Sequence, residues 1–374
     1  MAVRHEGRMQ IPTRTATIAQ ARQRGDLIAG VLPIHYPRAL LRAHGVQPIE
    51  IWAPPRQDPT AGNAQFQAYA CAIVRHGAAL LLAGPGRDVD LILVPHTCDA
   101  LQGLGSVLLD FVKPPQPVLT LYHPRGRRQA DRTFLERELR RLGERLREVT
   151  GRQPTDADLH AAIDVEEEAT DRLARLCLHG AEAALSDRQL YTLVRSREYL
   201  PAEAFVALVD GLVPPRGSAS PPPVQHHGRP PVRLMLGGIV PEPMSVFDAI
   251  SAMGASVVAD DLACGSRRLY QRTRGDDPYA RLAESLMSGP PDPTLGAPIA
   301  ARADYIARRM RESGAQGLLV YDVKFCEPEL FDLPQLRDQL STQRLPMLHV
   351  EFETATTIAQ QALNRIEAFV EMLQ

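Results

Sequence analysis

Five cysteines are the residues of this chain best suited to metal or redox chemistry: Cys71, Cys98, Cys177, Cys264 and Cys326. None belongs to a CxxC pair, which zinc sites commonly use, and the closely spaced cysteines of ferredoxins are also absent. A site built from these thiols must therefore be assembled by the tertiary fold. Soft thiolates suit an iron–sulfur cluster. The alternative is that they are buried or surface thiols without a ligand.

Two of the cysteines follow apolar runs that are typical of buried strands. Cys98 ends the stretch "LILVPHTC" (91–98), and Cys326 ends "GLLVYDVKFC" (317–326). Ligands of open parallel sheets bind outside the carboxyl ends of the strands. Cysteines placed there by two facing domains are therefore predicted to converge in the cleft between the domains.

Two further cysteines lie in different surroundings. Cys177 is on an apolar helical face within "RLARLCLHG", which favours core packing. Cys264, in "ADDLACGSRR", follows a strand and precedes a glycine. It is a candidate ligand or a candidate neighbour of the ligands.

His35 and His96 are candidate catalytic residues, because each follows an expected strand and a proline. A histidine at such a position could hydrogen-bond a substrate carbonyl, and a structural histidine with satisfied hydrogen bonds is the alternative. Asp260 and Asp261 end another expected strand, and we interpret them as caps of the following helix.

Composition indicates a soluble globular protein of two or three domains, with 374 residues, 44% hydrophobic and 23% charged. The net charge of -2 creates no field that would attract nucleic acid or an anionic membrane. No apolar run reaches the roughly 18 residues of a membrane span, and the first 20 residues lack a signal-peptide core. These features predict a cytoplasmic protein whose cysteines do not form a disulfide framework.

Eight apolar runs suited to buried strands alternate with segments of helical period. The runs span 27–33, 48–53, 91–95, 117–122, 232–238, 256–261, 317–323 and 346–352. Glycines 45 and 254 stand where helices preceding two of these runs would end. Such alternation predicts an α/β fold with parallel sheets covered on both faces.

The chain divides into four predicted regions. They are an N-terminal α/β domain (1–130), a helical segment (131–213), a Pro-rich linker (214–231) and a C-terminal α/β domain (232–374). In each half, a strand leads through a proline-containing loop and a helix to a glycine and a second strand, and a later strand leads to a cysteine. We infer a duplicated unit, that is, two similar flavodoxin- or Rossmann-like domains.

Four segments, taken together and in this order, resemble the 2-hydroxyacyl-CoA dehydratase / benzoyl-CoA reductase family. They are "YACAIVRHG" (69–77), "VPHTCDALQGL" (94–104), "VVADDLACGSRRLY" (257–270) and "VKFCEPELFDLPQLRDQL" (323–340). The beginning and end of the chain also look like those of the family, so the resemblance covers essentially the whole chain.

The resemblance implies a 4Fe-4S cluster. In the family each of two related subunits binds such a cluster through three cysteines, which correspond here to Cys71, Cys98 and Cys326. The fourth iron is left to water, a small sulfur ligand or the substrate. Cys264 matches a position where the family often has cysteine, and it is not one of the three main ligands.

The resemblance also implies partners and a reaction. Family members work as heterodimers of paralogous iron–sulfur subunits, and a separate activator that hydrolyses ATP supplies electrons. Dehydratases expel water from a 2-hydroxyacyl-CoA through a ketyl radical, whereas benzoyl-CoA reductases reduce the aromatic ring of an aryl-CoA. Only two of the 42 basic residues are lysine. This composition is typical of GC-rich bacteria that degrade aromatic compounds, so we favour the reductase and keep the dehydratase as the alternative.

Two further functions remain open. One is a non-catalytic protein of the same fold that binds a cluster or carries electrons. The other is a nucleotide- or sugar-binding protein with incidental cysteines, which would need a Gly-rich phosphate loop. Neither "GGIVPEP" (237–243) nor "LAGPGRD" (82–88) has the spacing of a P-loop or a dinucleotide fingerprint.

Overall fold

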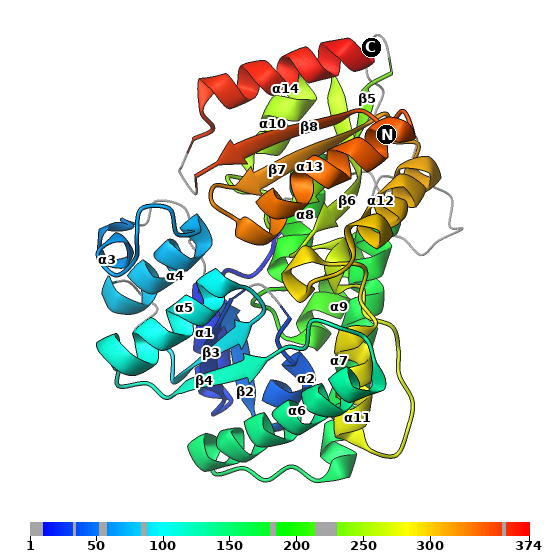
Figure 1. Ribbon diagram of the computed structural model, residues 1–374. Coiled ribbons are helices and arrows are strands. Elements are labelled where there is room, and N and C mark those ends of the chain that lie inside the picture. The colour runs from blue at the N-terminus through cyan, green and yellow to red at the C-terminus, as the bar shows by residue number, and fades with distance from the viewer. Residues whose placement is uncertain are drawn as a thin grey trace, which may run out of the picture.

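Two four-stranded parallel sheets organise the part of the chain that the computed structural model describes, which is residues 10–32, 35–51, 58–83, 88–179, 185–213, 230–353 and 357–374 (Figure 1). The N-terminal sheet contains β1 (Leu27–Val31), β2 (Val46–Glu50), β3 (Leu91–His96) and β4 (Val118–Tyr122). The C-terminal sheet contains β5 (Val232–Gly238), β6 (Ala255–Leu262), β7 (Gly317–Val323) and β8 (Met347–Phe352). The predicted α/β class with parallel sheets is confirmed.

The two sheets share one topology. The strand orders are β2-β1-β3-β4 and β6-β5-β7-β8, and every pair is parallel. In each sheet, the second strand lies on one side of the first strand and the third strand lies on the other side. The strand order therefore reverses between β1 and β3 in the N-terminal sheet, and between β5 and β7 in the C-terminal sheet. Ligands of open α/β sheets bind at such a switch point, outside the carboxyl ends of the strands. Cys98 and Cys326 therefore occupy equivalent places, each after the third strand of its sheet.

Helices cover both sheets and fill the region between them. Those of the N-terminal half are α1 (Arg14–Gln23), α2 (Arg38–Ala43), α3 (Thr60–Asn63), α4 (Ala72–Ala83), α5 (Asp99–Ser106) and the π-helix η2 (Val107–Val112). The middle contributes α6 (Gln129–Thr150), α7 (Asp156–His179), α8 (Asp187–Ser196) and α9 (Ala202–Leu212). The C-terminal half has α10 (Ser245–Ala252), α11 (Pro278–Met287), α12 (Ile299–Ser313), α13 (Glu327–Thr342) and α14 (Gln360–Leu373), with short 3₁₀ turns η4 (Ser266–Arg268) and η5 (Pro293–Leu295).

The middle helices join the two halves rather than forming a separate body. Helix α7 packs against α2 of the N-terminal half and α11 of the C-terminal half, while α8 packs against α10 (Figure 1). The largest apolar core reaches from Ile28 in β1 to Val350 in β8. Most of the expected linker, residues 214–229, lies outside the described residues. Over the described ranges, no helix combines the length and the apolar character needed to cross a bilayer.

Several local sequence signals act as expected. Ser186 and Gln189 form a reciprocal capping box at the start of α8, since each side chain accepts the backbone N–H of the other residue. Gly45 and Gly254 have φ angles of 67° and 78°, each one residue after the C-cap residue of α2 or α10. Only glycine adopts this left-handed conformation without strain, which explains why each helix ends there.

A close contact between α3 and α4 fixes the helix that follows Cys71. A Cβ atom added at Gly62 would lie 1.8 Å from the backbone oxygen of Arg75. Gly62→Ala is therefore expected to force α3 and α4 apart, at a cost of about 1–3 kcal/mol or more in unfolding free energy. Urea denaturation followed by circular dichroism measures this loss.

Gly103 in α5 provides the matched control. A Cβ atom at this position would meet nothing within 4 Å. Gly103→Ala should raise the unfolding free energy by up to about 1 kcal/mol, because alanine favours helix more than glycine. Equal effects of the two substitutions would show that the α3–α4 contact does not constrain the fold.

Candidate functional site

Each of three cysteines stands at the start of a helix. Cys98 is the N-cap residue of α5, and Cys326 is the N-cap residue of α13. Cys71 directly precedes α4, and its carbonyl accepts the N–H groups of Val74 and Arg75 at 3.1 and 3.2 Å. The positive ends of three helix dipoles therefore lie at cysteine positions, where they favour thiolate over thiol.

The Cys71 and Cys326 thiols are in hydrogen-bond contact, although 255 residues of sequence separate them. Both are buried, and they come from opposite halves of the chain. The hydrogen bond from Cys326, together with backbone N–H groups at the start of α4, lowers the pKa of Cys71. The same bond raises the pKa of Cys326, since its proton is the one shared. Within the pair, ionisation is therefore favoured at Cys71 over Cys326.

Cys98 is the third thiol in this region. Its side chain is partly exposed. Burial of the sulfur raises its pKa to about 12, and the charge of Cys71 contributes in the same direction. Within the part of the chain that the structure describes, no group of three or more His, Cys, Asp or Glu residues is close enough to hold a metal ion.

In type, the three residues suit a cluster of iron and sulfide. Their donors are soft thiol sulfurs, which iron–sulfur units prefer. Cys71 and Cys326 already adjoin across the two halves, and helix N-termini favour the negative charge that such ligands carry. Cys71, Cys98 and Cys326 therefore match such a group in donor type, although the described residues do not bring three ligands close enough together to hold it.

Cys264 and Cys177 lie in a second buried region. Cys264 has no exposed surface, and burial raises its pKa to about 12; its charged neighbours include Arg195 and Glu198. Cys177 is 6% exposed and donates a hydrogen bond to Asp260. Its expected burial in helix packing is confirmed. Cys264 lies near Cys177, because its charge raises the pKa of that thiol.

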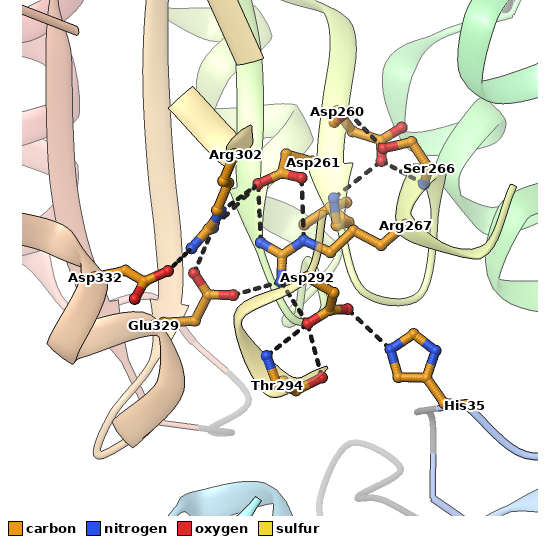
Figure 2. A network of polar contacts seen from close by, with 11 residues as sticks. His35, Asp260, Asp261, Ser266, Arg267, Asp292, Thr294, Arg302, Glu329 and Asp332 are labelled. Carbon is orange, nitrogen blue, oxygen red and sulfur yellow. Dashed lines mark hydrogen bonds and ion pairs between the residues drawn. The ribbon is translucent and has the colours of Figure 1, made fainter. Parts of the chain in front are cut away.

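A buried network of charged side chains includes Glu329, which follows Cys326 closely in the chain (Figure 2). Glu329, three residues after Cys326, accepts hydrogen bonds from Arg267 at 2.5 Å and from Arg302 at 2.6 Å. Both arginines also donate to Asp261, at 2.9 and 3.0 Å. The interpretation of Asp261 as a helix cap is wrong, since its carboxylate binds two guanidinium groups. Asp260 accepts the N–H of Ser266, the first residue of the 3₁₀ turn η4, but Gly265 and not Asp260 is the N-cap residue of that turn.

His35 connects this network to the N-terminal half. Its Nε2 lies 3.0 Å from Oδ2 of Asp292, as Figure 2 shows, and its Nδ1 lies 2.7 Å from the Tyr270 hydroxyl. The other carboxylate oxygen of Asp292 is 3.9 Å from Arg267. His35 is 3% exposed and has a φ of 45°, a conformation that costs a non-glycine residue energy.

His96 is placed differently. Its ring packs edge-on against Tyr122 with 4.4 Å between centroids, and among the described residues neither of its buried ring nitrogens has a hydrogen-bond partner. Burial lowers the pKa of His96. The His96 ring is therefore a neutral imidazole in contact with an aromatic ring. It makes no hydrogen bond to any of the described cysteines.

Sequence patterns alone assigned no role to most charged residues of the network. Arg267 falls within the segment that carries Cys264, and Glu329 follows Cys326 closely, but Asp292 and Arg302 stand outside any recognised motif. The available signal was the charged pair "DD" at the end of an apolar strand, followed by "RR". Charges in such surroundings are buried only when they are paired.

Comparisons with known proteins agree with the sequence resemblance. A sequence model of the family described as 2-hydroxyglutaryl-CoA dehydratase, D-component, matches residues 33–373. The chain is 23% identical to the (R)-phenyllactyl-CoA dehydratase beta subunit of Clostridium sporogenes, covering 94% of this chain and 93% of that protein. It is 24% identical to the beta subunit of (R)-2-hydroxyglutaryl-CoA dehydratase of Acidaminococcus fermentans, covering 95% of each. It is 25% identical to the C subunit of benzoyl-CoA reductase of Thauera aromatica, covering 91% and 89%.

Proposed function

Because the chain belongs to the 2-hydroxyglutaryl-CoA dehydratase D-component family, which joins subunits of 2-hydroxyacyl-CoA dehydratases and benzoyl-CoA reductases, we propose that it is the 4Fe-4S subunit of an ATP-dependent, low-potential acyl-CoA enzyme. The observation that carries this proposal is the contact between Cys71 and Cys326 across the two halves of the chain. Both thiols lie at helix N-termini, where a ligand thiolate is stabilised.

In this proposal, Cys71, Cys98 and Cys326 would hold the cluster. When bound, it would supply single electrons at low potential and Lewis acidity. The hydrogen bond with Cys326 and the backbone N–H groups at the start of α4 lower the pKa of Cys71, which favours its ionisation. The apolar core that contains Cys71 and Cys326 excludes water from these two sulfurs.

The favoured reaction is reduction of the aromatic ring of benzoyl-CoA or another aryl-CoA by single-electron transfers. The arginine-rich composition supports it, with only two lysines among 42 basic residues, and the C subunit of a benzoyl-CoA reductase is among the relatives. The alternative is elimination of water from a 2-hydroxyacyl-CoA, which the two dehydratase beta subunits support. A non-catalytic cluster or electron carrier of the same fold is the second alternative.

The names of the relatives as beta and C subunits support a multisubunit enzyme. We propose that this chain pairs with a paralogous iron–sulfur subunit and receives electrons from a separate activator that hydrolyses ATP. The sequence itself has no P-loop.

The isolated chain is expected to show no turnover of acyl-CoA or aryl-CoA substrates, because it has no means of driving an electron to very low potential. Turnover should require the paralogous subunit, the activator and ATP together. Anaerobic assays by liquid chromatography, with benzoyl-CoA and a 2-hydroxyacyl-CoA as parallel substrates, measure this directly and separate reductase from dehydratase.

The control is the complete mixture without ATP, which should be inactive. Turnover by the isolated chain with a mild chemical reductant would contradict the proposed role of the partners. If the chain contains iron but the complete mixture consumes neither substrate, the non-catalytic alternative is favoured.

A further inference from the structure

A cavity of about 260 Å³, here named the α6–η5 cavity, lies between the start of α6 and the turn η5. Its apolar walls come from α6, α11 and η5, and they include Leu135, Leu286 and Leu295. The loop between β4 and α6 contributes two cations to the lining, Arg125 and Arg127. The cavity therefore combines apolar walls with a pair of guanidinium groups.

The size of the α6–η5 cavity limits its ligand to a compact molecule. An apolar cavity of about 150 Å³ is sufficient for benzene, whereas pockets for drug-sized ligands measure about 300–1,000 Å³. A volume of about 260 Å³ therefore suits a single ring, or a branched chain of similar size, with one polar head group. A whole acyl-CoA thioester is larger than a drug-sized ligand and does not fit within it.

The two guanidinium groups are able to bind an anion. Nη2 of Arg127 donates to the carbonyl of Gly289 at 2.8 Å, and within the described ranges this guanidinium has no carboxylate partner. Arg125 has one carboxylate neighbour, Asp99, at 3.8 Å, and the two side chains are 62% and 82% exposed. Water screens such an exposed pair. Both arginines can therefore pair with a carboxylate in the cavity, as guanidinium forks commonly do.

The loop that carries the two arginines is fixed at both ends. Before it, the Nε2–H of His123 donates to the carbonyl of His35 at 2.8 Å. After it, the backbone N–H of Arg128 donates to Asp131 at 2.8 Å. A Cβ atom added at Gly126, between the two arginines, would lie 2.5 Å from a carboxylate oxygen of Asp131. The backbone is therefore ordered before a ligand binds, which lowers the entropy cost of binding.

One carboxylate, Asp292, lines the cavity, but its charge is already compensated. Its Oδ1 accepts the N–H and hydroxyl of Thr294, both at 2.7 Å. Its Oδ2 lies 3.0 Å from Nε2 of His35, and Arg267 is 3.9 Å away (Figure 2). Burial lowers the pKa of His123 to about 3, so this ring in the lining carries no charge. The charge that the lining offers to a ligand is therefore the positive charge of the two arginines.

The start of α6 favours a carboxylate over a phosphate ester. Phosphate groups commonly bind the free N–H groups of a helix N-terminus. At α6 the carboxylate of Asp131 already occupies this position, because it accepts both the backbone N–H and the guanidinium of Arg128. A planar carboxylate needs only the fork of an arginine.

We propose that the α6–η5 cavity binds a small organic carboxylate whose apolar body is one ring or a short branched chain. The apolar body contacts the leucines of the walls, and the carboxylate pairs with Arg125 and Arg127. This inference goes beyond the proposed function and does not depend on it, since the described lining includes none of the five cysteines. The lining comes from the loop after β4 and from α11 and η5 of the C-terminal half. A bound ligand should therefore also raise the unfolding temperature.

Isothermal titration calorimetry of the full chain with benzoate tests the two arginines. Benzoate should bind, and Arg127→Gln should weaken its binding by about tenfold or more, as loss of a hydrogen bond to a charged group does. Benzyl alcohol, which has the ring without the charge, should bind the unmodified chain at least about tenfold more weakly than benzoate. Arg132→Gln is the control and should leave benzoate binding unchanged, because Arg132 lies on α6 outside the lining.

Ala297→Leu tests the cavity without a change of charge. Ala297 is part of the lining, so the larger side chain should fill the space and abolish benzoate binding. This variant also keeps the inference testable if Arg127→Gln fails to fold, which thermal unfolding of each variant shows. In crystals soaked with 4-bromobenzoate, anomalous scattering should place the bromine inside the α6–η5 cavity.

The outcomes decide the inference independently of any acyl-CoA turnover. If benzoate does not bind at millimolar concentration, or if neither Arg127→Gln nor Ala297→Leu weakens its binding, the site is wrong. A bromine position outside the cavity has the same consequence. If phenyl phosphate binds more tightly than benzoate, the assignment of a carboxylate ligand is overturned. Because every measurement uses the full chain without partners, a failure here leaves the proposed function standing.

Discussion

Chains carrying Cys71→Ser, Cys98→Ser or Cys326→Ser, purified without oxygen and supplied with iron and sulfide, are each expected to bind at least about tenfold less iron than the unmodified chain. Serine replaces a soft ligand with a hard, poorly ionised one. Because Cys71 and Cys326 come from opposite halves, losing the cluster should also loosen the contact between the halves. Iron and sulfide quantification, with electron paramagnetic resonance after reduction, measures the first effect, and thermal unfolding measures the second.

The remaining two cysteines provide controls within the same chain. Cys177→Ser should keep its iron and lose only modest stability, because that thiol is packed in α7 and hydrogen-bonded to Asp260. Cys264→Ser should keep the cluster, with at most a changed potential or oxygen sensitivity. The order of iron loss across the five variants decides the assignment. Iron lost from Cys177→Ser but kept by Cys326→Ser would show that the ligands are elsewhere.

Much of the fold followed from hydrophobic runs and glycines. The expected strands 232–238 and 317–323 match β5 and β7, and the run expected at 48–53 begins two residues earlier, at Val46. These are local properties, since a buried parallel strand needs a continuous apolar run whatever surrounds it. The shared strand order of the two sheets also agrees with the similarity of the two halves.

The pairing of side chains across the two halves could not be predicted from hydrophobic runs and glycines. Cys71 meets Cys326, and His35 meets Asp292 across 257 residues. Such pairs depend on how two sheets face each other, and no periodicity in one segment encodes that arrangement. His35 was recognised because it follows a strand, but its two partners, Asp292 and Tyr270, became apparent only from the structure.

The charge network explains how this arrangement is held. Glu329 lies in the first turn of α13, three residues after the N-cap residue Cys326. Through Arg267 it is connected to Asp292 and so to His35 in the N-terminal half. A shift of α13 would therefore break the contacts that connect Glu329 through Arg267 and Asp292 to His35. We infer that the network holds Cys326 in place opposite Cys71.

Glu329→Gln is therefore expected to have a large effect on stability. The carboxylate is fully buried between Arg267 and Arg302. Burial acts against its ionisation, yet the two guanidinium groups lower the pKa of Glu329 below its ordinary value. A neutral amide leaves both arginines short of negative charge, and breaking a buried ion pair in this way costs about 3–5 kcal/mol. Urea denaturation at pH 7 measures the loss, and iron content should fall with it because Cys326 is no longer fixed.

The pH dependence distinguishes this charge effect from a change of shape. A carboxylate whose pKa is lowered by folding adds stability above its unfolded pKa of about 4.3, and that contribution is lost as the pH falls through the folded value. The difference between the unmodified chain and Glu329→Gln should therefore be constant near neutrality and shrink below about pH 4. Glu312→Gln is the control: Glu312 pairs with Arg309 and has a side chain 53% exposed, so its loss should cost less than about 1 kcal/mol. If both substitutions cost the same, or if the Glu329→Gln difference persists unchanged in acid, the buried charges do not hold α13 and Cys326 is positioned by apolar packing alone.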